Sequence, residues 1–233
     1  MLTAVQYAVR PMVPGDIPQV VDIERESFPS AWPQTTYKRE LQNRLARYLV
    51  LVQQPPERPP TPPAPVRRPR GWRETLRRLF SLQPPPEPTQ ELILGFVGLW
   101  LMVGEAHIVT LAVRQSQRRR GLGELLLITA TEVAVAHGQE VLTLEVRRSN
   151  EAAVSLYEKY GFTRVGVRSR YYDNREDALI MTTPPLISTA FQERYQSLKE
   201  AQQRRWGSTY SLPQNERGLA RETSGRPRLL DKM

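Results

Sequence analysis

The 233-residue sequence contains no cysteine and only two histidines. Without cysteine the chain cannot form a disulfide, hold zinc through thiolates or use a cysteine nucleophile. His107 begins an apolar segment, and His137 precedes Gly138 at an expected helix end, so we assign structural roles to both histidines. We therefore expect neither a histidine-dependent hydrolase nor a metal enzyme, and no metal cofactor.

Long apolar runs are also missing. A membrane helix needs about 18 to 20 apolar residues, and a secretory signal needs an apolar core behind a basic start. The apolar run at 92–103 is too short and carries glycines, and we recognise no signal peptide. These features predict a cytoplasmic protein.

Proline is abundant, but it is concentrated in one segment. Twelve of the 21 prolines lie between Pro55 and Pro88, which predicts an extended spacer instead of a folded unit. The end of the chain is polar and weakly patterned. We expect one domain formed by residues 1–54 and 90–183, a proline-rich basic insert at 55–89 and a polar C-terminal extension at 184–233.

The net charge of +9 lies almost wholly outside that domain, which has 17 basic and 16 acidic residues. The domain is therefore not expected to bind nucleic acid. The insert and the extension have the charge to contact an anionic membrane or RNA, and residues 71–82 of the insert are expected to form a short amphipathic helix. Alternatively, the insert packs on its own domain or is disordered. We expect a monomer.

A basic loop at 113–124 connects a predicted strand to a predicted helix. Residues 107–113 are apolar and β-branched, and residues 122–136 have apolar residues at helical spacing. Free backbone N–H groups and the positive end of the helix dipole converge at such a helix start, where Gly121 and Gly123 allow close approach. The loop therefore predicts a pyrophosphate site, and the alternative is an ordinary basic surface turn.

Hydrophobic patterning along the rest of the chain predicts a mixed α/β sandwich with helices on both faces of a sheet of about seven strands. Strands are expected at 7–10, 48–52, 92–103, 107–113, 141–146, 162–168 and 178–181, with the last closing the sheet. Helices are expected near 16–28, 32–45, 122–137 and 151–160, with a further tail helix around Phe191, Tyr195 and Leu198. Ser149 or Asn150 is expected to cap the helix at 151–160.

The loop pattern Arg118-x-x-Gly121-x-Gly123 differs from the dinucleotide and P-loop patterns, which need other glycine spacings. It is similar to the Gln/Arg-x-x-Gly-x-Gly/Ala signature of the GNAT superfamily of N-acetyltransferases. That resemblance implies the GNAT fold, and it implies that the loop holds the pyrophosphate of acetyl-CoA.

Two residues near the fifth predicted strand suit acetyl transfer from a thioester to an amine. Glu145, in an otherwise apolar strand, lies either in a solvated groove or in an ion pair. If the strands at 107–113 and 141–146 separate at a bulge, the groove presents Glu145 on one wall and Tyr157 on another. Glu145 then fits the base for an α-amine of pKa about 8, and Tyr157 fits the proton donor to the thiolate. The alternatives are a pairing of Glu145 with Arg147 or Arg114, and a Tyr157 that fills a helix–sheet seam.

The block from Leu144 to Phe162 resembles the RimI-type ribosomal-protein-alanine N-acetyltransferases, as do Arg170–Ala178 and the Phe28-Pro29 pair with Trp32. The resemblance implies Glu145 as proton acceptor, Tyr157 as proton donor and Asn150 as a cofactor contact. It implies further cofactor contacts from the backbone of Leu111, Ala112 and Val113 and from Arg118, Arg119, Arg120, Gly121, Leu122, Gly123 and Glu124. Phe28, Pro29, Trp32, Tyr171 and Tyr172 are implied to line the acceptor groove.

The acceptor implied by this resemblance is a protein with a free N-terminus, namely the N-terminal alanine of a small-subunit ribosomal protein. Two other interpretations stay open from the sequence. One keeps acetyl-CoA but changes the acceptor to a lysine side chain or a small-molecule amine. The other is a non-catalytic acetyl-CoA-binding scaffold, whose appendages recruit a membrane or the ribosome.

Overall fold

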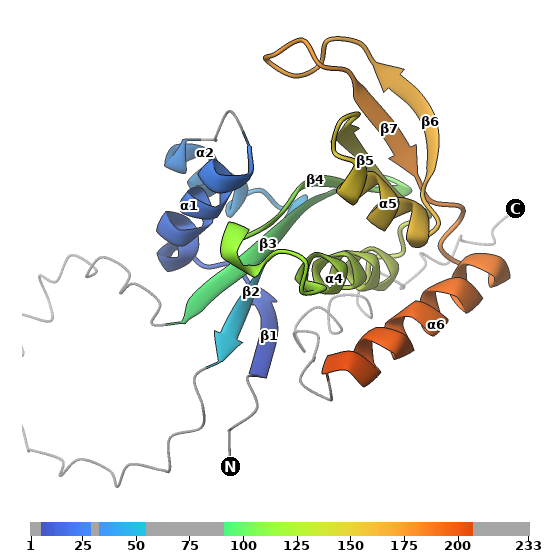
Figure 1. The fold of residues 1–233 in the computed structure, drawn as a ribbon, viewed down its shortest axis with the longest axis horizontal. Coiled ribbons are helices and arrows are strands. Elements are labelled where there is room, and N and C mark those ends of the chain that lie inside the picture. The colour runs from blue at the N-terminus through green and yellow to red at the C-terminus, as the bar shows by residue number, and fades with distance from the viewer. Residues whose placement is uncertain (1–5, 29–32, 55–90, 207–233) are drawn as a thin grey trace, which may run out of the picture.

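A computed structural model describes residues 6–28, 33–54 and 91–206. They form a seven-stranded sheet with helices on both faces (Figure 1), which confirms the expected fold class. The strands are β1 (Gln6–Pro11), β2 (Ala46–Gln54), β3 (Leu92–Leu101), β4 (Glu105–Val113), β5 (Val141–Arg147), β6 (Thr163–Arg168) and β7 (Ala178–Thr182). The helices are α1 (Ile17–Ser27), α2 (Gln34–Glu40), α4 (Leu122–Ala136), α5 (Glu151–Lys159) and α6 (Thr189–Trp206). The expected insert helix at 71–82 lies outside the described residues.

The sheet order is β1-β2-β3-β4-β5-β7-β6, with β4 and β5 parallel and the other neighbours antiparallel. The expectation that the strand at 178–181 closes the sheet is wrong, because β7 lies between β5 and β6. The physical reason is burial: Ala178, Leu179 and Met181 are buried, whereas the β6 residues are exposed or half-buried. An apolar strand gains most from a central position, and a polar strand tolerates the edge.

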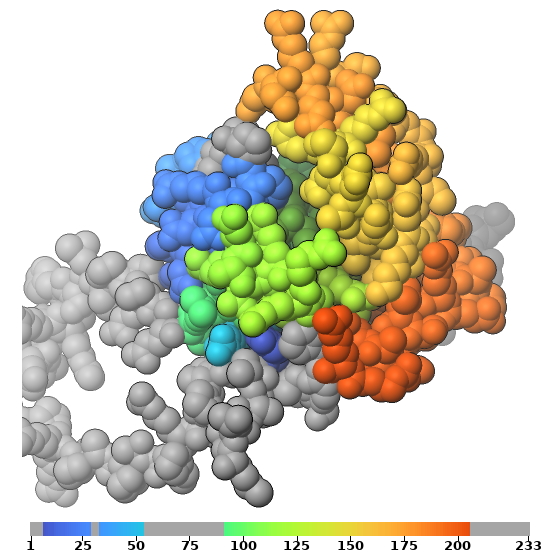
Figure 2. Space-filling model, in the orientation of Figure 1, coloured from blue at the N-terminus to red at the C-terminus, as the bar shows by residue number. Residues whose placement is uncertain are grey.

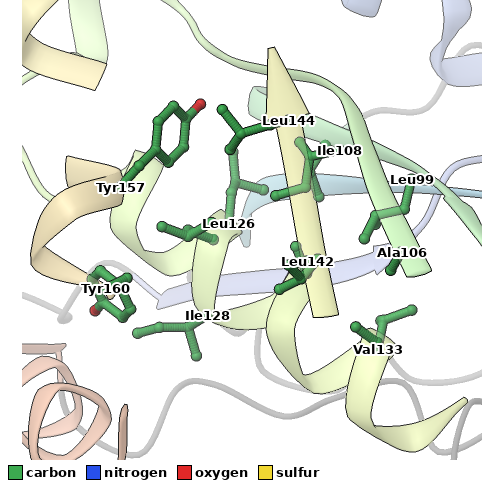
Figure 3. Close-up of a cluster of buried hydrophobic side chains, with 14 of the residues drawn as sticks. Leu99, Ala106, Ile108, Leu126, Ile128, Val133, Leu142, Leu144, Tyr157 and Tyr160 are labelled. Carbon is green, nitrogen blue, oxygen red and sulfur yellow. The ribbon is translucent and has the colours of Figure 1, made fainter. Parts of the chain in front are cut away.

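One side of the sheet is covered by α4 and α5. Leu126 and Val133 of α4 pack with Leu142 and Leu144 of β5, and Tyr157 of α5 joins the same cluster (Figure 3). Helix α4 is apolar around most of its circumference, so a helix that touched only the sheet would leave part of its surface in water. Its outer side therefore needs a second cover.

Helix α6 supplies that cover. Leu186 before it and Phe191 and Tyr195 within it belong to the same buried cluster, and the Tyr195 hydroxyl donates a hydrogen bond to the Ile128 carbonyl at 3.3 Å. The two α6 rings are stacked with centroids 6.0 Å apart. The expected tail helix is confirmed, but it extends the folded domain beyond residue 183. Among the described helices, none is long and apolar enough to cross a membrane.

Helices α1 and α2 cover the other side of the sheet over its first four strands. Tyr37 of α2 meets the Tyr48 and Phe96 rings edge-on, with ring centroids 5.8 and 6.0 Å away. The Tyr48 ring lies over Gly98 of β3. A Cβ atom added to Gly98 would be 2.4 Å from this ring. Helix α2 ends at Glu40, earlier than expected, because Leu45 is exposed and has no core to join.

Candidate active site

The sheet opens between β4 and β5. Their pairing ends at Ile108↔Leu144, so the backbone of Leu111–Val113 pairs with β3 alone among the described strands. Val109 is an extra residue in β4, since Thr110 and Ile108 face consecutive residues of β3. This is the strand separation at a bulge that a ligand between the two strands requires. A hollow is visible here between the blue α1–α2 region and the yellow α5 region (Figure 2).

The loop after β4 ends at the N-terminus of α4, where backbone N–H groups lie next to this opening. Gly121 is the N-cap of α4 with φ 85°, a left-handed conformation that glycine adopts without strain. The first helical hydrogen bond runs from the Leu125 amide to the Gly121 carbonyl. The N–H groups of Leu122, Gly123 and Glu124 therefore precede the helical ladder, as a bound pyrophosphate would need.

Two arginine side chains of the loop bond to other groups of the protein, whereas its backbone offers the free N–H groups. Arg118 donates to the Val113 carbonyl at 3.1 Å and to the Ser27 hydroxyl at 3.0 Å, so its guanidinium ties the loop to β4 and α1. Arg120 donates to the Gln117 side chain at 2.6 Å. Arg119 has φ 62°, the left-handed region that non-glycine residues rarely adopt.

Glu124 faces α5 instead of the loop. Its carboxylate accepts hydrogen bonds from Lys159 and from the Tyr160 hydroxyl, the latter at 2.8 Å, and burial together with this carboxylate raises the pKa of Tyr160. These partners direct the Glu124 carboxylate toward α5, so Glu124 offers its backbone N–H and not its side chain as a contact for the pyrophosphate. The same arrangement fixes the start of α4 against the end of α5.

Glu145 lies on the face of β5 opposite the α4–α5 core and is paired on both carboxylate oxygens. Its Oε2 lies 2.8 Å from His107 Nε2, and its Oε1 lies 3.0 Å from Arg168 Nε. The alternative pairing with Arg147 or Arg114 is wrong, because those arginines pair with Glu176 and Glu26. Neither of the observed partners, His107 and Arg168, is indicated by the local sequence around Glu145.

Tyr157 approaches the strand opening from the other side of the sheet. Its ring lies in the α4–α5 core, 5.6 Å from the Phe162 ring and beside Leu144 at the same end of β5 (Figure 3). Burial, and to a smaller degree the nearby Tyr172, raises the pKa of Tyr157. The phenol is protonated at neutral pH, and its raised pKa makes it a weaker acid than an exposed tyrosine.

Tyr172 links the surroundings of Glu145 and Tyr157. Burial is the main cause that raises the pKa of Tyr172 to about 12, the Arg147 charge opposes it, and Glu145 adds to the rise. The Arg147 guanidinium lies 3.8 Å from the Tyr172 ring centroid, and Tyr171 meets the same ring edge-on at 5.1 Å. The two tyrosines thus lie together on the β6–β7 connection.

Glu176 holds that connection to the β5–α5 junction. Its carboxylate accepts a bond from Arg147 at 3.1 Å and from the Ser149 backbone N–H at 2.8 Å. Hydrogen bonds from Ser149, and then from Arg147 and Asn174, lower the pKa of Glu176 to about 2. Tyr171 and Tyr172 are therefore carried by a connection that is anchored to β5, the strand that carries Glu145.

The remaining site residues have mixed outcomes. Asn150 is the N-cap of α5, and its side-chain oxygen accepts from the Ala153 amide at 3.2 Å, so the cap is Asn150 and not Ser149. Phe28 follows α1 and packs, half-buried, on the α1–α2 core. Pro29 and Trp32 lie outside the described residues.

The strand split between β4 and β5, followed directly by an open helix start, is an arrangement that suits an acyltransferase. Residues 17–162, more than half of the chain, match the model of the acetyltransferase (GNAT) family. The chain belongs to this family, whose acetyltransferases use acetyl-CoA.

Relatives by sequence agree with this assignment. A Bacillus subtilis protein, provisionally named a ribosomal protein bS18-alanine N-acetyltransferase, is 32% identical over 176 residues, which span 75% of this chain and 93% of the relative. The Escherichia coli ribosomal protein bS18-alanine N-acetyltransferase is 41% identical over 87 residues, covering 36% of this chain and 59% of the relative.

The fold has close counterparts among solved structures. The Escherichia coli ribosomal-protein-S18-alanine N-acetyltransferase superposes with a TM-score of 0.57 at 24% identity, over 78% of this chain and 96% of that one. Ard1 from Thermoplasma volcanium gives the same TM-score of 0.57 at 20% identity, over 76% and 97% of the two chains. At this identity the likeness concerns the fold alone.

Proposed function

We propose that this acetyltransferase transfers the acetyl group of acetyl-CoA to the N-terminal amine of a protein, and that the acceptor is the N-terminal alanine of a small-subunit ribosomal protein. The observation that carries the proposal is the approach of Glu145 and Tyr157 to the β4–β5 opening from opposite faces of the sheet. The names of the bacterial relatives support the choice of acceptor.

Acetyl-CoA fits the opening through backbone groups. The unpaired edge of Leu111–Val113 offers hydrogen bonds to the amides of the pantetheine arm, as an added strand would. The N–H groups of Leu122, Gly123 and Glu124 suit the pyrophosphate, and Arg119 and Arg120 add positive charge beside it. Arg118 and Asn150 contribute mainly by fixing the loop and the start of α5.

The acceptor lies, in this proposal, on the face of the sheet that carries Glu145. Phe28 at the end of α1 and the Tyr171–Tyr172 pair on the β6–β7 connection form opposite sides of its groove, with Pro29 and Trp32 expected beside Phe28. An extended N-terminus between them brings its amine to the opening, where the thioester carbonyl is also presented.

The reaction needs two proton movements. An α-ammonium must lose a proton before its nitrogen can attack the thioester, and Glu145 accepts that proton. As the C–N bond forms and the C–S bond breaks, Tyr157 gives its proton to the leaving thiolate. The second proton of the nitrogen, directly or through water, restores the Tyr157 phenol, so the proton on Glu145 is the one left to release.

One assay tests the acceptor. Purified protein is given acetyl-CoA with an Ala-starting ribosomal peptide, an N-blocked lysine peptide or a polyamine, and thiol release is followed. We expect turnover on the Ala-starting peptide. Turnover on the lysine peptide or the polyamine alone would contradict the N-terminal acceptor, and no turnover with any amine would favour the non-catalytic scaffold.

Two conservative variants test the site. Glu145→Gln keeps the shape of the side chain but removes the base, so kcat should fall by about 10²-fold or more and recover partly as the pH rises above the amine pKa of about 8. Tyr157→Phe should lower kcat more than it changes the KM for acetyl-CoA, because the phenol acts only as the C–S bond breaks. Unchanged kcat in either variant would remove that residue from the mechanism.

A further inference from the structure

We propose that His107 relays the proton that Glu145 takes from the acceptor amine, and passes it through Thr143 and Glu105 to the solvent. This inference rests on the proposed role of Glu145 as the base. It gives the histidine, to which sequence patterning assigns a structural role, a part in catalysis.

The stoichiometry of the reaction requires a route by which one proton leaves the site in each turnover. An ammonium and a thioester become an amide, a thiol and one free proton, so each turnover leaves one proton that must reach water. Glu145 is the first acceptor of that proton, but only 9% of its side chain is exposed and both of its oxygens are already paired. A base in this position works repeatedly only if it can pass its proton on.

A continuous chain of contacts leads outward from Glu145. Its Oε2 lies 2.8 Å from His107 Nε2, and Nδ1 of the same ring lies 2.9 Å from Thr143 Oγ1. The Thr143 hydroxyl donates in turn to the Glu105 carboxylate. The exposed fraction of the side chain rises along this route, from 9% at Glu145 to 19% at His107 and 38% at Glu105.

The register of β4 and β5 places these four side chains next to one another. His107 of β4 lies opposite Thr143 of the parallel strand β5, and residues two apart on a strand share a face. Glu105 and His107 on β4 therefore point to the same side as Thr143 and Glu145 on β5. The four side chains form a row across the last paired stretch of the two strands, just before the strands separate.

The bonds in the row have a definite direction. Because the Thr143 hydroxyl donates to Glu105, its oxygen accepts from His107 Nδ1–H. His107 Nε2 then shares one proton with Glu145 Oε2. When Glu145 takes a proton from the amine, the shared proton moves fully onto Nε2, Nδ1–H passes its proton to Thr143, and the Thr143 hydroxyl proton goes to Glu105 and then to water. One proton enters and one leaves, which leaves the imidazole protonated at Nε2 alone. Before the next turnover, proton exchange with water returns the imidazole to its Nδ1–H form, and the Thr143 hydroxyl turns back toward Glu105.

Arg168, Tyr172 and Arg147 are ionisable groups on the elements next to Glu145. Arg168 pairs with Glu145 from the edge strand β6, and Glu145 acts on Tyr172 of the β6–β7 connection through its charge, with Arg147 lying on the Tyr172 ring. Arg168 holds the other oxygen of Glu145, which fixes the carboxylate so that Oε2 faces the imidazole. None of these three groups lies between His107 and Glu105, so the outward route runs through Thr143.

Thr143 gives the sharpest test because its hydroxyl can be removed without a change of shape. Thr143→Val interrupts the route, whereas Thr143→Ser keeps a hydroxyl. On the amine that the wild-type protein acetylates, Thr143→Val should lower kcat about 10-fold, with both KM values within 2-fold. The lost rate should return as imidazole is added, because an external base then takes the proton, and Thr143→Ser should resemble wild type throughout.

His107→Ala with added imidazole provides a second measurement, with His137→Gln at the far end of α4 as the matched control. We expect imidazole to restore kcat in His107→Ala and to leave His137→Gln unaffected. Wild-type kcat and pH profile in both Thr143→Val and His107→Ala, beside a slow Glu145→Gln, would overturn the relay alone. Wild-type kcat in Glu145→Gln would overturn the proposed base, and the relay with it.

Discussion

Gln202 of α6 donates a hydrogen bond from Nε2 to the carbonyl oxygen of Gly121, 3.0 Å away and 81 positions earlier in the chain. Gly121 is the N-cap of α4 and also receives the amide of Leu125. A helix from the polar end of the chain therefore fixes the residue from which the proposed pyrophosphate site begins. The Gln202 side chain is buried, so its amide has no water to replace this bond.

This contact predicts an effect on cofactor binding without an effect on chemistry. Gln202→Leu should weaken CoA binding by roughly 3- to 10-fold, the equivalent of one lost hydrogen bond of about 0.5–1.5 kcal/mol, while kcat stays within 2-fold. Gln203→Leu, at an exposed position of the same helix, is the matched control. Calorimetric titration of both variants with CoA measures the difference, and equal Kd values would show that α6 does not support the loop.

Much of the fold follows from local patterns because each pattern is decided within a few residues. Two examples are the start of α5 at Asn150 and the β4–loop–α4 unit, in which Gly121 precedes the helix. Capping chemistry and apolar spacing determine both. The position of β7 between β5 and β6 depends on which strand buries its sides best, a property of the assembled sheet. The polar composition of residues 184–233 indicates an extension outside the domain, although Phe191 and Tyr195 of α6 lie on one face and join the core.

The candidate site also combines features that the local sequence indicates with features that only the assembled sheet creates. Glu145 and Tyr157 were found from residue type and spacing, because the resemblance lies in one continuous block. The contact between His107 and Glu145 depends on the register of two parallel strands, joined by a helix, and no local signal reports that register. Alternation along β5 places Thr143 and Glu145 on one face, and only the register with β4 adds His107 to that face.

The buried tyrosines predict how stability depends on pH. Burial raises the pKa values of Tyr37, Tyr157, Tyr160 and Tyr195 in the folded chain above the ordinary value of 10.0. A raised pKa means that folding favours the neutral phenol. The contribution of each phenol to the free energy of unfolding is therefore fully present below pH 10 and is lost as the pH rises above that value.

The free energy of unfolding should therefore be flat with respect to these groups up to about pH 9 and fall above about pH 10. Urea titrations monitored by circular dichroism between pH 8 and 11.5 measure the slope. Tyr195→Phe should reduce the slope above pH 10, because one fewer phenol ionises on unfolding. An identical slope in the variant would mean that Tyr195 ionises equally in both states.

Gly98 should be intolerant of any side chain. A Cβ there would lie 2.4 Å from the Tyr48 ring, closer than real contacts allow, so Gly98→Ala should destabilise the fold by about 1–3 kcal/mol through overpacking. Thermal unfolding measures this loss. Tyr48→Val removes the ring, and the double variant should be more stable than the sum of the two single effects predicts. Additive losses would show that the strain at Gly98 comes from elsewhere.

The proline-rich insert should be removable without loss of the fold. Gln53 and Leu92 are paired in the antiparallel β2–β3 ladder, so the chain leaves and returns at adjacent positions of the sheet. Replacing residues 55–90 by a short Asn-Gly turn therefore joins two strands that already form a hairpin. The unfolding midpoint and kcat should match those of the full chain, measured by calorimetry and thiol release.

The start of β3, which follows the insert in the sequence, contacts the residue directly after β4. Arg114, directly after β4, donates to the Ile93 carbonyl at 3.2 Å, and its amide donates to Leu94 at 2.8 Å, one and two residues after β3 begins. A contribution of the insert to catalysis through this contact would therefore appear as a raised KM for acetyl-CoA. Loss of kcat in a variant that keeps the full unfolding midpoint would instead place the insert in the acceptor groove, and it would contradict the accessory role that its composition predicts.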